Sequence, residues 1–443
     1  MSHARAIDGV VSSTSSTATR AVDSDAAARI AMALFYLGLL LSSITTLRIS
    51  SFTLGDIFLI ASLAASIVAR VYRRDSYHFR TSTLLIFTLV SVGGLFATAN
   101  AIDPYGSVTV IARLVMVVLI LPWQAKFLID TDHRFRTAAM FFVLGGAIAG
   151  SGTLIQARFG ADAIPGAVIT NVGRFTGFAQ HVSDLGGITS VTLVTALALF
   201  TASTGLRSQI FLLTCSSMCL IGLVLSGSVS GLIAVAMGLL TLILRRALRL
   251  RYVALILAAT YAAAYIATEI QAKTSGALDP LDRIRQTLGI TESGRYSTSE
   301  SRVDTYAQAL DHFQHNPLFG AGLDPLSSFV YGTSPAHNLL IAAAFQGGVL
   351  LLLGVLVAVA RPLSGGWIRR SRNPATTQAL AAVVASISFA MTAPNMYNRY
   401  FWIPVALLVV ARELHRQSMV AEDKDLGRHR HLMRATHLSG GVK

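Results

Sequence analysis

Long apolar segments recur along the chain, and they restrict its fold more than any other feature. Each holds about 16 to 24 residues with few charged side chains, enough for an α-helix to cross about 30 Å of hydrocarbon. We therefore expect an all-α integral membrane protein. The segments predict about twelve transmembrane helices and one larger extracytoplasmic loop that contains short helices.

The composition supports this class and excludes a soluble domain. Of the 443 residues, 53% are hydrophobic and 13% are charged, whereas soluble globular domains carry about 25% charged residues. The formal net charge of +14 would suit a nucleic-acid-binding protein. The basic residues, however, lie between apolar segments in alternate loops. We therefore expect the lipid bilayer, and no nucleic acid, as the partner of this charge pattern.

The predicted transmembrane helices follow the apolar segments. Their approximate limits are 30–47, 52–69, 82–99, 107–122, 137–156, 185–202, 209–225, 228–244, 252–269, 337–360, 375–392 and 398–412. The boundary at 226–227 stays open, because Ser226-Gly227-Ser228 fits either a tight turn between two helices or a kink inside a longer one.

The basic residues predict the orientation, since cytoplasmic loops carry an excess of lysine and arginine. One set of loops is rich in them: Arg70, Arg73, Arg74, Arg80, Lys126, Arg134, Arg136, Arg207, Arg245, Arg246, Arg249, Arg251, Arg361, Arg369, Arg370 and Arg372. The short loops of the opposite set contain only Arg48 and Arg399. Both termini are therefore expected in the cytoplasm, in agreement with an even number of helices.

The chain divides into five expected regions. Residues 1–28 are rich in Ser, Thr and Ala and lack the apolar core of a signal peptide, so we expect a disordered cytoplasmic tail. Residues 29–269 would form transmembrane helices 1 to 9, and residues 270–336 the extracytoplasmic loop. Residues 337–412 would form helices 10 to 12, followed by a basic cytoplasmic tail at 413–443.

The large loop is expected to contain two short helices. Asp279-Pro280 is typical of a helix start, with proline at the first helical position. Ser301 to Asp304 resembles a capping box, and the following helix would end before Pro317. This pattern puts Arg302 in the first turn of the second helix.

Three arginines outside the cationic loops are candidates for binding an anion. Arg174 lies between two glycines in the other long outer loop, and Arg302 in the large loop; a solvated loop arginine is the alternative for Arg302. Arg113 is about six residues, or roughly 9 Å, inside an apolar segment. An arginine there is costly and by default functional, although its side chain could instead extend to the headgroups.

His337 is the candidate general base. It lies at the mouth of a predicted transmembrane helix, and histidine titrates close to neutral pH. Asn338 could orient the ring or a sugar, or it could cap the helix. His312 and His315 would face water. No cysteine or histidine spacing is typical of a metal site, and Cys215 and Cys219 are expected to be buried without a disulfide.

One run of residues resembles the O-antigen ligase and polymerase family. The run consists of Arg302, Leu310, Asn316-Pro317-Leu318-Phe319-Gly320-Ala321-Gly322, His337-Asn338-Leu339-Leu340 and Gly347-Gly348. Gly173-Arg174-Phe175-Thr176-Gly177 is similar to an earlier loop of the family, and the helix count also agrees. Two features depart from the pattern: no Ser-Arg occurs near 226–231, and Gln346 stands where an acidic residue is common.

The resemblance implies a metal-independent, inverting glycosyltransferase without cofactors on the outer face of the cytoplasmic (inner) membrane. Its donor would be a glycan on a polyprenyl diphosphate, commonly undecaprenyl, and its acceptor a glycan or a lipid. By the same resemblance, Arg174 and Arg302 would bind the diphosphate and His337 would activate the acceptor hydroxyl. We also expect Arg113, Asn338, Gly320 and Gly322 at the substrate, and polysaccharide-assembly proteins as possible partners.

Two functions from other classes stay open. A secondary transporter commonly has twelve helices, but some of them should be broken at the membrane midplane, and proline is scarce inside the predicted helices. A non-catalytic component of polysaccharide export would tolerate the loss of His337.

Overall fold

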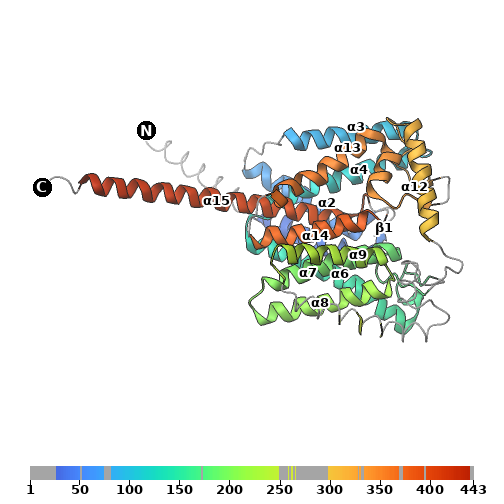
Figure 1. The fold of residues 1–443 in the computed structure, drawn as a ribbon, viewed down its shortest axis with the longest axis horizontal. Helices are drawn as coiled ribbons and strands as arrows, with labels where there is room; N and C mark the ends of the chain where they lie inside the picture. The colour runs from blue at the N-terminus through green and yellow to red at the C-terminus, as the bar shows by residue number, and fades with distance from the viewer. Residues whose placement is uncertain are drawn as a thin grey trace, which may run out of the picture.

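The computed structural model describes residues 26–49, 52–73, 81–170, 173–248, 258, 261–262, 265, 298–327, 329–330, 334–368, 373–393 and 396–439. In this part of the chain the fold is a bundle of long helices that run in alternating directions between two ends (Figure 1). Six of these helices are long and apolar enough to cross a membrane. The prediction of a polytopic helical membrane protein is thereby confirmed, although the count of twelve is not.

The helices and strands have the following bounds. A helix at Ala26–Leu41 precedes α2 (Leu54–Arg73), α3 (Thr81–Ala99), α4 (Pro104–Val115), a π-helix (Met116–Ile120), α5 (Leu121–Leu128), α6 (Asp132–Phe159), a 3-10 turn (Ala161–Ala163), α7 (Val182–Thr201), α8 (Leu206–Leu225) and α9 (Val229–Leu244). Then come α12 (Thr298–His315), α13 (Leu339–Ile368), α14 (Pro374–Ala390) and α15 (Arg399–Ser439). Two short antiparallel pairs join β1 (Arg48–Ile49) to β2 (Phe52–Thr53) and β3 (Phe329–Val330) to β4 (Ser334–Pro335).

The helices agree closely with the apolar segments. Every predicted transmembrane helix among the described residues overlaps an observed helix, with α4, the π-helix and α5 together forming one. The predicted helix at 252–269 lies mostly outside the described residues, and so does the predicted loop helix after Asp279. At the boundary left open, Gly227 has φ +58° and the Ser228 hydroxyl accepts a hydrogen bond from the Gly231 amide at 3.2 Å. A turn therefore separates α8 from α9.

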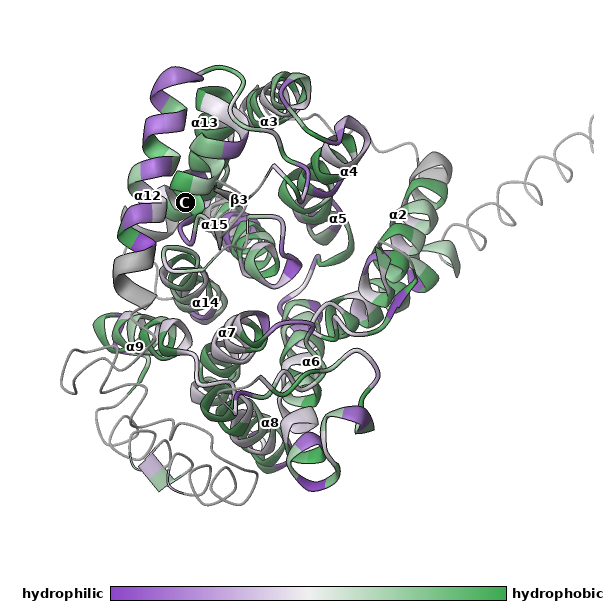
Figure 2. Cartoon of the chain, turned by 90° about the vertical axis from the view of Figure 1, so that its right-hand side faces the viewer, coloured by the Kyte–Doolittle hydropathy of each residue, from purple (hydrophilic) through white to green (hydrophobic). Residues whose placement is uncertain are grey.

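The core lies around α7, which is the most buried of the candidate transmembrane helices. It packs against α6, α8, α9 and α14, whose labels lie around it in Figure 2, and most of its residues are buried. A helix that is apolar all round suits the centre of a membrane bundle. The apolar first part of α15 is also buried, and its C-terminal part projects from the end of the bundle opposite to α12 (Figure 1).

Helix α12 lies across one end of the bundle, here called the site end, and begins earlier than expected. Its described part already includes Thr298, so the capping box predicted at Ser301 is wrong and Arg302 does not lie in the first turn. Nothing between Thr298 and Ser301 interrupts a helix, which explains the additional turn. The helix ends at His315, two residues before Pro317, as predicted.

A break in α13 receives the glycine-rich turn that follows α12. Gly348 has φ +68° inside α13, and the Val349 amide donates to the Pro317 carbonyl at 2.7 Å. The Gly322 amide donates to the Gln346 carbonyl at 3.0 Å. A Cβ at Gly320 would lie 2.6 Å from the Gln346 carbonyl, so the two chains can approach this closely only with glycine.

Candidate active site

His337 lies between β4 and α13 at the site end, and its ring is held in one orientation. Its Nδ1 lies 2.7 Å from the Pro335 carbonyl oxygen. A carbonyl can only accept, so Nδ1 carries the proton in this hydrogen bond. In the neutral ring, Nε2 is then unprotonated and can accept a proton from another molecule.

The surroundings of His337 favour this neutral form. Burial of the half-buried ring is the main cause that lowers the pKa of His337, and the positive charge of Arg302 lowers it further. The hydrogen bond to Pro335 raises the pKa in part, and His181 lowers it slightly. The net pKa is below the usual value for histidine, so the ring is neutral at neutral pH.

Helix α12 brings Arg302 to His337. The Tyr306 hydroxyl, one turn after Arg302, donates to the backbone carbonyl of His337 at 2.8 Å. Burial raises the pKa of Tyr306, and the Arg302 charge opposes that shift. The same face of α12 therefore fixes the backbone at His337 and supplies a cation close to its ring.

Asn338 caps α13. Its side-chain oxygen accepts hydrogen bonds from the amides of Leu340 at 3.0 Å and Ile341 at 3.1 Å. Its amide group donates to the Met391 carbonyl at 3.2 Å. The capping alternative for Asn338 is therefore observed, and contact with a substrate stays a prediction.

Gly320 and Gly322 likewise have structural contacts. The Gly320 carbonyl accepts a hydrogen bond from the Asn100 side chain at 3.0 Å, and a Cβ at Gly322 would lie 2.7 Å from the Cα of Ala101. Both glycines thus fit the turn against α13 and the loop after α3. A direct role at the substrate stays a prediction for them too.

Arg174 lies in the loop between α6 and α7, at the same end of the bundle. Its Nε donates to the Ser226 carbonyl in the turn between α8 and α9 at 2.6 Å. Ser230, in the first turn of α9, has its hydroxyl 3.5 Å from the Thr392 carbonyl, and Thr392 follows Met391, the partner of Asn338. A chain of contacts through this turn and the start of α9 therefore connects Arg174 with the segment that begins α13.

Arg113 is half-buried in the last turn of α4, just before the π-helix. The π-helix precedes Pro122, a residue that cannot donate within a regular helix. The charge of Arg113 lowers the pKa of Arg48 and opposes the burial that raises the pKa of Tyr397. The structure thus brings Arg113 close to Arg48 and Tyr397.

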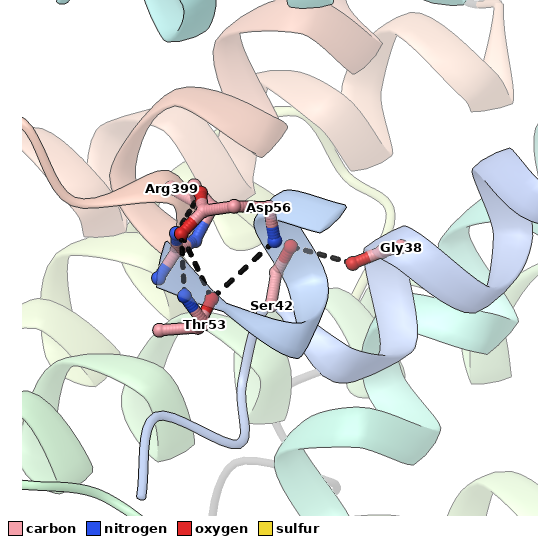
Figure 3. Close-up of polar contacts among 5 residues, drawn as sticks. All are labelled: Gly38, Ser42, Thr53, Asp56 and Arg399. Atoms are coloured by element: carbon pink, nitrogen blue, oxygen red, sulfur yellow. Dashed lines mark hydrogen bonds and ion pairs between the residues drawn. The ribbon is translucent and has the colours of Figure 1, made fainter. Parts of the chain in front are cut away.

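The sequence interpretation missed two carboxylates at this end. Asp56 forms an ion pair with Arg399, and its other oxygen accepts from the Thr53 amide at 2.9 Å and hydroxyl at 3.1 Å (Figure 3). Asp184 accepts from Asn398 and from Tyr400, both at 3.1 Å. A usable signal was present, since each aspartate lies in the first turn of a helix whose next residues are apolar, and Arg399 is one of the two basic residues of the arginine-poor side.

The fold and these contacts define a polytopic helical membrane protein with polar and basic side chains gathered at one end of the bundle. Among the described residues, no group of three or more His, Cys, Asp or Glu side chains is placed to hold a metal ion.

The family model described as O-Antigen ligase matches residues 214–356, a range that includes Arg302, Gly320, Gly322, His337 and Asn338. This match, over about a third of the chain, confirms the resemblance to the O-antigen ligase and polymerase family. Arg113 and Arg174 precede the matched range. A comparison with curated proteins gives no match.

Proposed function

We propose that the protein transfers a glycan from a polyprenyl diphosphate, commonly undecaprenyl diphosphate, to an acceptor hydroxyl of a growing cell-surface polysaccharide or of a lipid. The observation that carries this proposal is the state of His337. Its Nδ1 is engaged by Pro335, which leaves Nε2 as a proton acceptor at the end of the bundle that also carries Arg302. Both residues lie within the range of the family match.

His337 acts as the general base. The acceptor hydroxyl attacks the anomeric carbon and loses its proton to Nε2, while the bond from that carbon to the diphosphate oxygen breaks. The electron pair of this bond leaves with the diphosphate, so one bond forms and one breaks, with inversion at the carbon. The low pKa of His337 keeps the base unprotonated at neutral pH.

Arg302 and Arg174 bind the diphosphate and stabilise the charge that develops on it. A guanidinium group can bind phosphate with two parallel hydrogen bonds, and fixed cations in a partly buried site need no metal ion for this task. The position of Arg302 beside His337 supports its part in this role. Arg174 comes from a different loop at the same end of the bundle. Arg113, which lies deeper in the bundle, would assist in binding the diphosphate.

We place this site on the outer face of the inner membrane, with both termini in the cytoplasm. The described basic side chains of the predicted cytoplasmic loops support this orientation because they meet at the opposite end of the bundle. Arg361 donates to Thr83, Arg412 donates to the Arg361 carbonyl, and Lys126 pairs with Glu413. Polysaccharide-assembly proteins are then expected partners.

The break in α13 is a feature that transporters share, because broken helices often form their substrate sites. In such sites the freed backbone groups face the substrate. Here the break at Gly348 is filled by the glycine-rich turn, and the amides of Val349 and Gly322 are bonded across it. The break therefore gives little support to transport.

Replacing His337 by Ala should test the proposal directly. In an assay with purified protein and a lipid-linked donor, turnover should fall by about 10²- to 10⁴-fold, since general base catalysis contributes that much. Donor binding should be largely retained. The matched control is His315→Ala, because the His315 side chain is 73% exposed on α12. Near-normal turnover in His337→Ala would overturn the proposal and favour an export component.

A further inference from the structure

The two aspartates at the site end differ in how their oxygens are occupied. Asp56 uses both, because Oδ1 pairs with Arg399 and Oδ2 accepts from Thr53 (Figure 3). Asp184 uses only Oδ1, which accepts from the Asn398 amide group and from the Tyr400 hydroxyl at 3.1 Å each. Asp184 is half-buried, and its Oδ2 accepts no hydrogen bond from the described part of the chain and is not enclosed by it. This oxygen is therefore available to a ligand.

The partners of Asp184 hold its carboxylate in a fixed position. The Asn398 amide group also donates to the Tyr400 hydroxyl at 3.1 Å, so the three side chains bond to one another. The Tyr400 ring is buried and meets the Phe389 ring edge to face, with the centroids 6.3 Å apart. A Cβ at Gly187, one turn after Asp184 in α7, would lie 2.7 Å from the Tyr400 ring, so the ring can pack there only against glycine. Such support is typical of a binding group that is ordered before the ligand arrives.

Hydrogen bonds connect Asp184 with the start of α13. Asn398 lies in the connection between α14 and α15, and Met391 in the same connection accepts from the Asn338 side chain. Asn338 directly follows His337 in the chain. Helices α7, α14 and α15 also pack against one another and lie side by side when viewed from the site end (Figure 2). One short connection therefore contacts both the carboxylate and the residue next to the proposed base.

The chemistry of the available oxygen fits a sugar hydroxyl. A carboxylate oxygen accepts hydrogen bonds from hydroxyl groups, and its charge repels the phosphate oxygens of a diphosphate. Among the described residues, neither hydrogen-bond donor to Asp184 carries a charge, so its negative charge is not spent in a hydrogen-bonded ion pair. Asp184 therefore suits the uncharged part of a glycan substrate, whereas arginines suit the diphosphate.

We propose that Asp184 binds a hydroxyl group of a substrate sugar through Oδ2, while Asn398 and Tyr400 hold the carboxylate through Oδ1. This inference rests on the proposed function and adds a residue that recognises the glycan itself. The donor glycan and the acceptor glycan both offer such hydroxyl groups, and the experiment separates these two sources.

The test is Asp184→Asn in the full-length protein, because asparagine keeps the shape and one oxygen for Asn398 and Tyr400. Native mass spectrometry would measure the binding of undecaprenyl diphosphate and of the lipid-linked repeat unit isolated from the cells that make the polysaccharide. The variant should bind the lipid-linked repeat unit about 10- to 100-fold more weakly, as expected for one hydrogen bond to a charged group, and undecaprenyl diphosphate equally well. The matched control is Asp162→Asn, since Asp162 is exposed at the same end and should affect neither ligand.

The outcomes separate the sources of the sugar and the two proposals. Unchanged donor binding with a raised KM for the acceptor in Asp184→Asn would assign the hydroxyl to the acceptor, whereas no change in either would overturn the inference alone. An equal loss for undecaprenyl diphosphate would also overturn it, because Asp184 would then act on the fold or on the diphosphate. If the unaltered protein binds neither lipid, the proposed function fails and the inference fails with it.

A second measurement on the unaltered protein covers the case in which Asp184→Asn does not fold. Lipid-linked repeat units and acceptors that each lack one sugar hydroxyl should include one that binds about 10- to 100-fold more weakly than its parent. Equal binding of all of them would overturn the inference.

Discussion

Replacing Asp56 by Asn should destabilise the protein by about 3–5 kcal/mol, the usual cost of removing one partner from a buried ion pair. The side chains of Arg399 and Asp56 are only 14% and 17% exposed, so water screens the pair weakly. Asparagine keeps the shape of the residue and can still accept from Thr53. The predicted loss is therefore assigned to the guanidinium of Arg399, which would remain buried without its carboxylate (Figure 3).

A double-mutant cycle measures this coupling. We would follow reversible unfolding in mixed micelles for Asp56→Asn, Arg399→Gln and the double variant, and compare the free energies of unfolding. The double variant should be no less stable than Asp56→Asn, because both charges are then absent. A cost below about 1 kcal/mol for Asp56→Asn, or additive effects in the cycle, would refute the reasoning.

Two further predictions concern the site and its orientation. Because the Arg302 charge lowers the pKa of His337, Arg302→Gln should move the acidic limb of kcat/KM to higher pH, since less like charge then opposes protonation; an unmoved limb in the residual activity would contradict the proximity of these groups. Single cysteines at the exposed positions Asp162 and Thr204 should differ in intact cells, with only Asp162→Cys reacting with a membrane-impermeant thiol reagent. The two native cysteines are buried and should react little, and labelling of Thr204→Cys alone would invert the topology.

The positions of the helices could be predicted because they depend on local patterns. A transmembrane helix satisfies its backbone polar groups within its own segment, so its limits follow the apolar run. Pro317 ended α12 close to the expected residue. The predicted start of α12 was wrong because a capping box is a weak signal. Nothing in Thr298 to Glu300 prevents an additional helical turn.

The contacts of His337 and Asn338 are local in the same sense. His337 bonds to Pro335 two residues earlier, and Asn338 bonds to Leu340 and Ile341 just after it. A motif of a few consecutive residues can therefore determine all of these hydrogen bonds. This is why the sequence indicated a histidine and a capping residue at the mouth of α13.

The charged pairs at the site end are different, because their partners are distant in the chain. Asp56 and Arg399 are separated by 343 residues, and Asp184 and Asn398 by 214. The pattern of basic loops marked Arg48 and Arg399 as exceptions on the arginine-poor side, but it carried no information about their neighbours. Only the packing of the first helices against the last one brings these residues together. The same packing brings the Tyr400 hydroxyl to Asp184 at 3.1 Å, so the polar contacts at this end depend on an arrangement that no single segment encodes.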